Sequence, residues 1–126
     1  MNLLHLSHIK RTYNANSSHP VHALKDISFD VNAGEYIAIM GESGAGKSTL
    51  LNIIATLEKA SAGEILLNGQ DLSDLTADEA AKYRREHLGF IFQHFNLLDS
   101  LSNRDNIYLP LVLAQVPVAE MAKRVK

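Results

Sequence analysis

The sequence contains no cysteine, carries little net charge and has no long apolar run. The absence of cysteine excludes a disulfide framework and a zinc–thiolate site, and it fits a reducing compartment. A net charge of −2 gives no whole-chain basic field, so nucleic acid is not an implied partner. No stretch approaches the length of an apolar membrane span, and the N-terminus lacks a basic segment followed by an apolar one. We therefore expect a soluble, cytoplasmic chain that reaches a membrane only through a partner.

The composition is that of a globular protein. The 126 residues are 46% hydrophobic and 21% charged, which suffices for one domain with a core but not for two full ones. The six histidines are scattered, although His-x-x-His occurs at residues 5–8 and again at 19–22. Neither pair has a third ligand nearby in the sequence, so surface or strand histidines are a better interpretation than a metal site.

One segment matches a phosphate-binding motif. Residues 41–49 are G-E-S-G-A-G-K-S-T, which fits the Walker A pattern G-x-x-x-x-G-K-[ST]. A predicted buried strand at 36–40 precedes the segment, and a helix predicted over 47–57 follows it, which is the context that this phosphate loop requires. The alternative is a glycine-rich strand-to-helix turn that binds nothing.

The residue types of the loop suit a polyphosphate. Backbone N–H groups must approach the phosphates closely, and Gly41, Gly44 and Gly46 permit that approach, with Ser43 and Ala45 completing the cradle. The start of the following helix directs its positive dipole end at the anion. Three further assignments follow from side-chain chemistry: Lys47 for the β- and γ-phosphates, Ser48 for Mg²⁺, and Thr49 for the α-phosphate.

Alternating and continuous apolar patterns predict the strands. Residues 2–10 form a strand candidate with Leu4, Leu6 and His8 on one face. Further strands are predicted at 27–32 and 36–40, a hairpin at 64–72 with its turn at Asn68 and Gly69, and a buried central strand at 88–92 that ends just before Gln93.

Three further helices are predicted. Thr76 and Glu79 form a T-x-x-E capping box at the start of a polar helix that reaches about His87. Residues 103–109 are expected to be helical and to stop near Pro110, and residues 118–126 form an amphipathic helix. In the helix after the phosphate loop, four apolar residues form the stripe that we expect against the sheet: Leu50, Ile53, Ile54 and Leu57.

Taken in order, these segments resemble the nucleotide-binding subunit of an ATP-binding cassette (ABC) transporter. The resemblance rests on Tyr13 before a loop, A-L-K-D-I-S-F at 23–29, the phosphate loop, S-A-G-E-I-L-L-N-G at 61–69, and L-G-F-I-F-Q-H-F-N-L-L at 88–98. It covers residues 3–126. With Arg84 and Arg85 before it, the last segment looks most like the branch that serves lipoprotein release, macrolide export and antimicrobial-peptide resistance.

The resemblance implies a fold class and a domain organisation. The fold is α/β, with the core sheet of a P-loop NTPase, an antiparallel β-subdomain, and a chain truncated inside the helical subdomain. Residues 1–93 would hold the β-subdomain and the P-loop core, and residues 94–126 the Q-loop and the start of the helical subdomain.

The resemblance also implies roles for two residues outside the loop. Tyr13 would stack on adenine, although a tyrosine after a strand more often serves plain packing. Gln93 would be the Q-loop glutamine that binds Mg²⁺ or the attacking water and reports nucleotide state, although it could instead cap its strand. The cofactors are then ATP and Mg²⁺. The partners are a transmembrane permease subunit, touched by residues 94–109, and a second ATP-binding subunit, which places the protein at the inner face of the cell membrane.

The chain also departs from the family pattern. It contains no L-S-G-G-Q signature, no second acidic strand and no switch histidine. We expect the full-length protein to couple ATP binding and hydrolysis to membrane export or extraction, and this chain alone not to be hydrolytically competent. The alternative is a non-hydrolysing nucleotide-binding or interaction fragment. Another P-loop enzyme, a GTPase or small-molecule kinase, lacks support because there is no N-K-x-D motif and no arginine-rich lid.

Overall fold

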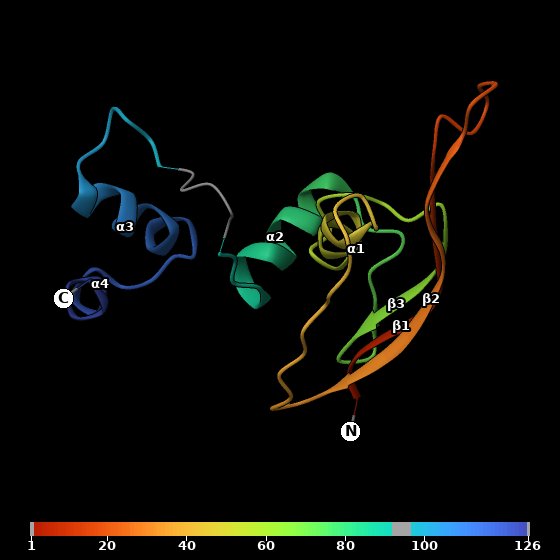
Figure 1. The fold of residues 1–126 in the computed structure, drawn as a ribbon. Coiled ribbons are helices and arrows are strands. Elements are labelled where there is room, and N and C mark those ends of the chain that lie inside the picture. The colour runs from red at the N-terminus through yellow and green to blue at the C-terminus, as the bar shows by residue number, and fades with distance from the viewer. Residues whose placement is uncertain (1, 92–96, 126) are drawn as a thin grey trace. The chain divides into compact units, whose positions relative to one another are not determined.

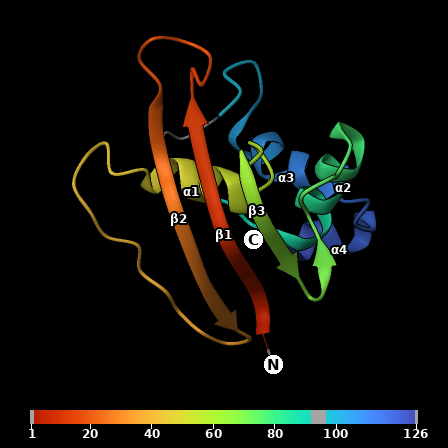
Figure 2. The same cartoon turned by 90° about the vertical axis from the view of Figure 1, so that its right-hand side faces the viewer.

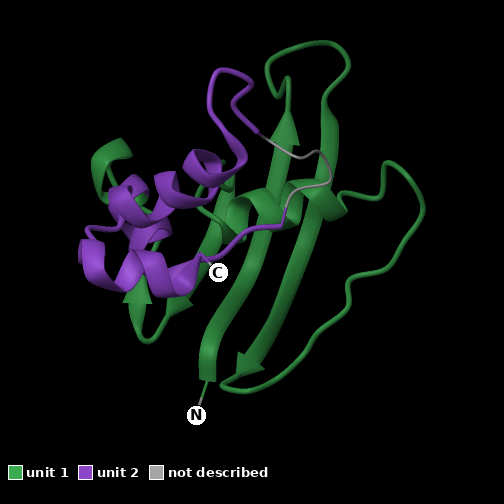
Figure 3. Cartoon of the chain, turned by 90° about the vertical axis from the view of Figure 1, so that its left-hand side faces the viewer, with its two compact units in different colours: residues 1–80 green, residues 81–126 purple. Residues whose placement is uncertain are grey.

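The computed structural model describes residues 2–91 and 97–125. The chain divides into two compact units, residues 1–80 and residues 81–126 (Figure 3). The predicted domain boundary at residues 93 and 94 lies outside the described residues, so that division stays a prediction. No helix in the described part of the chain combines the length and apolar character needed to cross a membrane.

Unit 1 is built on a four-stranded antiparallel sheet with the order β2-β1-β3-β4 (Figure 2). The strands are β1 (Asn2–Tyr13), β2 (Val21–Asn32), β3 (Ala62–Leu67) and β4 (Gln70–Asp71). The antiparallel β-subdomain expected from the sequence is thus present. Strands β1 and β2 are longer than predicted because the hairpin continues through polar residues up to the pair of Tyr13 with Val21. Such pairing is stabilised by cross-strand contacts that hydrophobic periodicity does not reveal.

A backbone irregularity corrects the predicted face of β1. Leu4 and Leu6 are buried as expected, but His8 is exposed and has a φ of 52°. The ladder shifts register between Leu6 and Ile9, so Ile9 takes the next core position and is fully buried. A bulge inserts one unpaired residue and thereby resets the alternation of faces. The simple period of two therefore fails at His8.

The hairpin predicted at residues 64–72 is confirmed, with its strands at Ala62–Leu67 and Gln70–Asp71. Asn68 and Gly69 have φ angles of 50° and 81°, the pair of positive values that a type I′ turn requires. Gly63, near the start of β3, also has a positive φ, and a Cβ there would lie 2.5 Å from the carbonyl oxygen of His8. Strand β3 therefore needs glycine where its backbone approaches that of β1 so closely.

Helix α1 (Lys47–Ile54) lies against the sheet (Figure 1). Leu50 and Ile53 are buried, which confirms half of the predicted apolar stripe. The helix is shorter than predicted because Thr56 adopts a φ of 62°, and the N–H of Leu57 bonds back to the carbonyl of Asn52. A left-handed residue at this position ends a helix, and it leaves the Leu57 side chain exposed.

Two predicted strands do not form within the described residues. Residues 36–40 and 88–91 have no strand assignment, and residue 92 lies outside the described residues. Tyr36 and Met40 are 100% and 89% exposed. A central parallel strand exists only where strands on both sides accept and donate its hydrogen bonds. None of the described strands pairs with these segments, so the sequence correctly shows apolar character but not the partner that would bury it.

Helix α2 (Ala77–His87) begins and ends as predicted. The backbone N–H of Thr76 donates to Glu79 Oε2 at 2.8 Å, and the N–H of Glu79 donates to Thr76 Oγ1 at 3.2 Å. This reciprocal pair is the capping box. Asp78 and Glu79 occupy its first turn and basic residues its last, an arrangement that complements the helix dipole.

The boundary between the units falls inside α2, and unit 2 holds α3 (Asn103–Leu113) and α4 (Val118–Arg124). The Ser102 side chain caps α3 by accepting the N–H of Asp105 at 3.1 Å. The prediction that this helix stops near Pro110 is wrong, because the helix continues to Leu113. Proline removes a single N–H donor, whereas its carbonyl still accepts the N–H of Ala114 at 3.0 Å.

Candidate functional site

The N-terminus of α1 offers free backbone donors. Its N-cap residue is Gly46, with φ 98° and ψ 9°, and no side chain caps the helix. The first helical bond runs from the N–H of Leu50 to the carbonyl of Gly46 at 2.9 Å. The N–H groups of Lys47, Ser48 and Thr49 precede that bond and take no part in the helical ladder. Together with the helix dipole, these donors favour an anion at this end of the helix.

Strand β2 fixes the position of this helix end. A Cβ on Gly46 would lie 2.6 Å from the carbonyl oxygen of Ala23 and 3.1 Å from Leu24 Cδ2. Only glycine allows so close an approach with a positive φ. Gly44 also has a positive φ, of 84°, but nothing lies within 4 Å of its Cβ position. The two glycines are therefore needed for different reasons, one for space and conformation and one for conformation alone.

Lys47 folds back over the loop. Its ammonium donates to the carbonyl oxygens of Gly41 and Glu42, both at 2.5 Å. The same loop contains a turn in which the N–H of Ala45 donates to the carbonyl of Glu42 at 3.1 Å. The ammonium group and the N-terminal end of α1 thus belong to one short loop, so a positive side chain and free N–H donors are near each other in the sequence and in space.

The predicted metal ligand Ser48 is exposed in the first turn of α1. In the described ranges, no group of three or more His, Asp or Glu side chains is arranged to hold a metal ion. Among the described residues a magnesium ion at Ser48 would therefore have no acidic cluster beside it, and phosphate oxygens and water would supply further ligands, as is usual for protein-bound Mg²⁺.

Tyr13 and Thr49 are brought together by the tertiary structure. Tyr13 is the last residue of β1, and its hydroxyl lies 3.3 Å from Thr49 Oγ1 in the first turn of α1. The same hydroxyl donates to Glu58 Oε1 at 2.5 Å. The tyrosine predicted for adenine and the threonine predicted for a phosphate are thus linked side chain to side chain. Gln93, the other predicted residue from outside the loop, lies outside the described residues.

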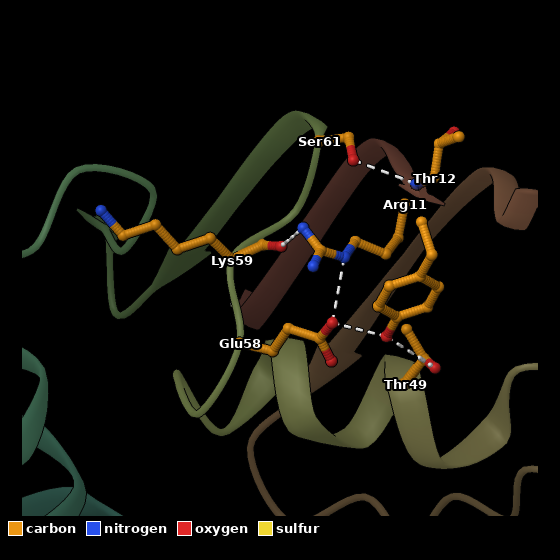
Figure 4. Close-up of polar contacts among 7 residues, drawn as sticks. Arg11, Thr12, Thr49, Glu58, Lys59 and Ser61 are labelled. Atoms are coloured by element: carbon orange, nitrogen blue, oxygen red, sulfur yellow. Dashed lines mark hydrogen bonds and ion pairs between the residues drawn. The ribbon is translucent and has the colours of Figure 1, made fainter. Parts of the chain in front are cut away.

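Arg11 and Glu58 were not predicted to belong to this site (Figure 4). The guanidinium of Arg11 lies 4.6 Å from the centre of the Tyr13 ring, and its Nε lies 3.0 Å from Glu58 Oε1. The Nε–H does not point along that line, so this contact is an ion pair and not a directed hydrogen bond. Arg11 could have been found from its spacing, since residues two apart in a strand share a face. Glu58 has no such signal.

The sequence matches a protein-family model over most of its length. The family model described as "ABC transporter" matches residues 24–126. The chain belongs to the ABC transporter family. Its relatives include the ABC transporter ATP-binding protein YxdL of Bacillus subtilis, 46% identical over 98% of the chain. The macrolide export ATP-binding/permease protein MacB of Aggregatibacter actinomycetemcomitans is 40% identical over the whole chain. The predicted resemblance to this family is thereby confirmed, and the macrolide-export relative is consistent with the predicted branch that serves lipoprotein release, macrolide export and antimicrobial-peptide resistance.

Solved structures agree with the family assignment. The chain matches the ATP-binding cassette MJ0796, solved as a dimer in a post-hydrolysis state with ADP and Pi, with a TM-score of 0.88 and 38% identity. The match covers 97% of this chain and 53% of that structure. The chain likewise spans about half the length of the ATP-binding proteins it matches, 47% of YxdL, and 19% of the longer MacB. The predicted fold class, that of an ABC ATPase, is confirmed.

Proposed function

We propose that this chain is the ATP-binding part of an ABC transporter ATPase, which couples ATP binding and hydrolysis to export across a membrane or extraction from it. The observation that carries the proposal is the phosphate loop. In this loop, the N-terminus of α1 has no side-chain cap, and the Lys47 ammonium lies against the loop that precedes it. The macrolide-export name of MacB supports the direction of transport.

Lys47 is the main cation of the proposed site. Its ammonium is held by two loop carbonyls, which carry only partial negative charge. The phosphates carry full negative charges, which attract the ammonium more strongly than the dipole of a carbonyl does. The ammonium therefore exchanges carbonyl oxygens for the β- and γ-phosphates when a nucleotide binds. The N–H groups at the start of α1 complete the cradle formed by residues 41–49.

Tyr13 recognises the base in this proposal. Its ring is half-buried at the end of β1, and its hydroxyl is anchored 3.3 Å from Thr49, which would contact the α-phosphate. Adenine is flat and apolar on its faces, so an anchored aromatic ring stacks on it with little loss of side-chain entropy. The adenine and phosphate contacts would thus arise from two connected elements, β1 and α1.

Magnesium enters with the nucleotide. The exposed Ser48 hydroxyl would be a protein ligand, with Gln93 as a second ligand on the family resemblance. A magnesium ion held there would supply positive charge that offsets the negative charge of the phosphates during phosphoryl transfer. The residues of this chain hold and orient the nucleotide. Phosphoryl transfer to water also needs several groups around the γ-phosphate, and these 126 residues lack the signature loop and the second acidic strand of the family, so we propose that they alone hydrolyse ATP negligibly.

The proposed partners follow from the names of the relatives. MacB is an ATP-binding/permease protein, and MJ0796 was solved as a dimer. We propose a transmembrane permease and a second ATP-binding subunit as partners, with the protein held at the inner membrane face by the permease. Residues 94–109 would form the surface that meets the permease.

Nucleotide titration with a matched pair of lysine variants tests the proposal. Lys47→Ala removes the loop cation, whereas Lys25→Ala removes an exposed lysine of β2 outside the loop. Because a hydrogen bond to a charged group contributes about 1.5–3 kcal/mol, Lys47→Ala should weaken Mg·ATP binding at least about tenfold in calorimetry. Lys25→Ala should match the unmodified protein. Equal affinity of all three proteins for Mg·ATP would contradict the proposed site.

A further inference from the structure

A polar network joins the end of β1 to the segment after α1 (Figure 4). Arg11 Nη1 donates to the carbonyl of Lys59 at 3.0 Å, and the N–H of Thr12 donates to Ser61 Oγ at 3.0 Å. The N–H of Ser61 donates in turn to the carbonyl of Lys10 at 2.7 Å. These bonds hold the segment that carries Glu58 against the strand that carries Tyr13. Glu58 and Tyr13 are therefore placed by a framework, not by their own contact alone.

We propose that Arg11 and Glu58 are positioning residues for Tyr13, which fix its ring for base stacking and keep it fixed while the phosphate loop is occupied. This inference rests on the function proposed above. Neither residue touches the nucleotide in the proposal; each acts through the tyrosine.

The proton count of the network supports a specific role for Glu58. Tyr13 has one hydroxyl proton, and it donates that proton to Glu58 Oε1. The 3.3 Å contact between Tyr13 and Thr49 must then use the proton of Thr49. A threonine hydroxyl also has a single proton, so it cannot donate to Tyr13 and to a phosphate oxygen at once. When Thr49 turns to a phosphate, Glu58 remains as the hydrogen-bond acceptor that holds Tyr13.

Arg11 sets the plane of the ring. Its guanidinium lies over the ring of Tyr13, and its charge is balanced by Glu58. The side chains of Arg11 and Glu58 are 26% and 20% exposed, so their attraction is screened less than that of a surface pair. The guanidinium over one face of the ring restrains its tilt, and the carboxylate bonded to the hydroxyl restrains the swing of the side chain.

Two ligands separate base recognition from phosphate binding. Mg·ATP carries both parts, whereas inorganic tripolyphosphate with Mg²⁺ carries only the phosphates. Binding of each is measured by calorimetry on the protein as its gene encodes it. The variants are Glu58→Gln, which keeps the shape but removes the charge, and Tyr13→Phe, which keeps the ring but removes the hydroxyl. Glu64→Gln, at an exposed carboxylate on β3, is the control.

We expect Glu58→Gln and Tyr13→Phe to weaken Mg·ATP binding about three- to tenfold and to change tripolyphosphate binding less than about twofold. The double variant should be no weaker than the worse single variant, because both changes act on the same hydrogen bond, which Glu58→Gln weakens and Tyr13→Phe removes. Arg11→Lys, which keeps the charge but loses the planar fork, should also lower ATP affinity selectively.

The outcomes distinguish this inference from the function on which it rests. If both ligands weaken equally in Glu58→Gln and in Tyr13→Phe, the residues serve general structure and the inference is wrong. The same conclusion follows if neither variant changes ATP affinity. If the unmodified protein binds neither ligand, the proposed function itself fails. If the circular dichroism spectrum shows that Glu58→Gln does not fold, Tyr13→Phe alone tests the inference, since that variant leaves the Arg11–Glu58 ion pair in place.

Discussion

Gly46 caps the phosphate-loop helix and also lies against β2, so its substitution by alanine should affect both nucleotide binding and the stability of unit 1. A residue with a Cβ at φ 98° costs about 1–2 kcal/mol in the left-handed region. The new Cβ would also lie 2.6 Å from the backbone oxygen of Ala23, which is too close for any real contact. Relieving that overlap must move α1 away from β2, at roughly 1–3 kcal/mol more. Gly46→Ala should therefore lower the free energy of unfolding by about 2–5 kcal/mol.

Gly44→Ala is the matched control, because its φ of 84° is similar but nothing lies within 4 Å of the new Cβ. It should cost only the conformational term, about 1–2 kcal/mol. Urea unfolding followed by far-ultraviolet circular dichroism measures the free energy of unfolding of both variants. Calorimetry measures how strongly each variant binds Mg·ATP. If Gly46→Ala is no less stable than Gly44→Ala, the packing of α1 on Ala23 does not position the loop, and the argument is wrong.

Three further predictions concern other parts of the chain. Thr76→Ala should destabilise α2 by about 1 kcal/mol, with Thr76→Ser near the unmodified protein in urea unfolding; equal loss in both would contradict the capping box. The pKa of Glu35 lies below its ordinary 4.5, because the backbone N–H and then the side-chain amide of Asn32 donate to its carboxylate. The stabilisation is therefore present above the unfolded-state pKa and is lost as the pH falls through the lower folded-state pKa, so Glu35→Gln should be less stable at pH 7 and lose its difference in acid; a difference that persists in acid would refute this. Finally, the 126 residues should show negligible Mg·ATP turnover in a phosphate-release assay, and turnover comparable to that of an intact relative would contradict the prediction.

Local features were predicted well because neighbouring residues determine them. The turn at Asn68 and Gly69 and the capping box of Thr76 and Glu79 each involve contacts within a few residues. The failures involve distant partners or a single backbone angle. Residues 36–40 have the composition of a buried strand but no described strand beside them, and the positive φ of His8 resets the faces of β1.

The candidate site divides in the same way. The sequence alone determined the phosphate loop, because its glycines, Lys47 and Ser48 are contiguous and their chemistry follows from their types and spacing. Only the tertiary structure decided how Tyr13 relates to that loop. Its hydroxyl contacts Thr49, 36 positions further along the chain, and Glu58, 45 positions further along, because the end of β1 lies beside both the first turn of α1 and the segment after α1. Spacing along a chain encodes contacts across a turn or along one face, whereas contacts at such separations depend on how whole elements pack.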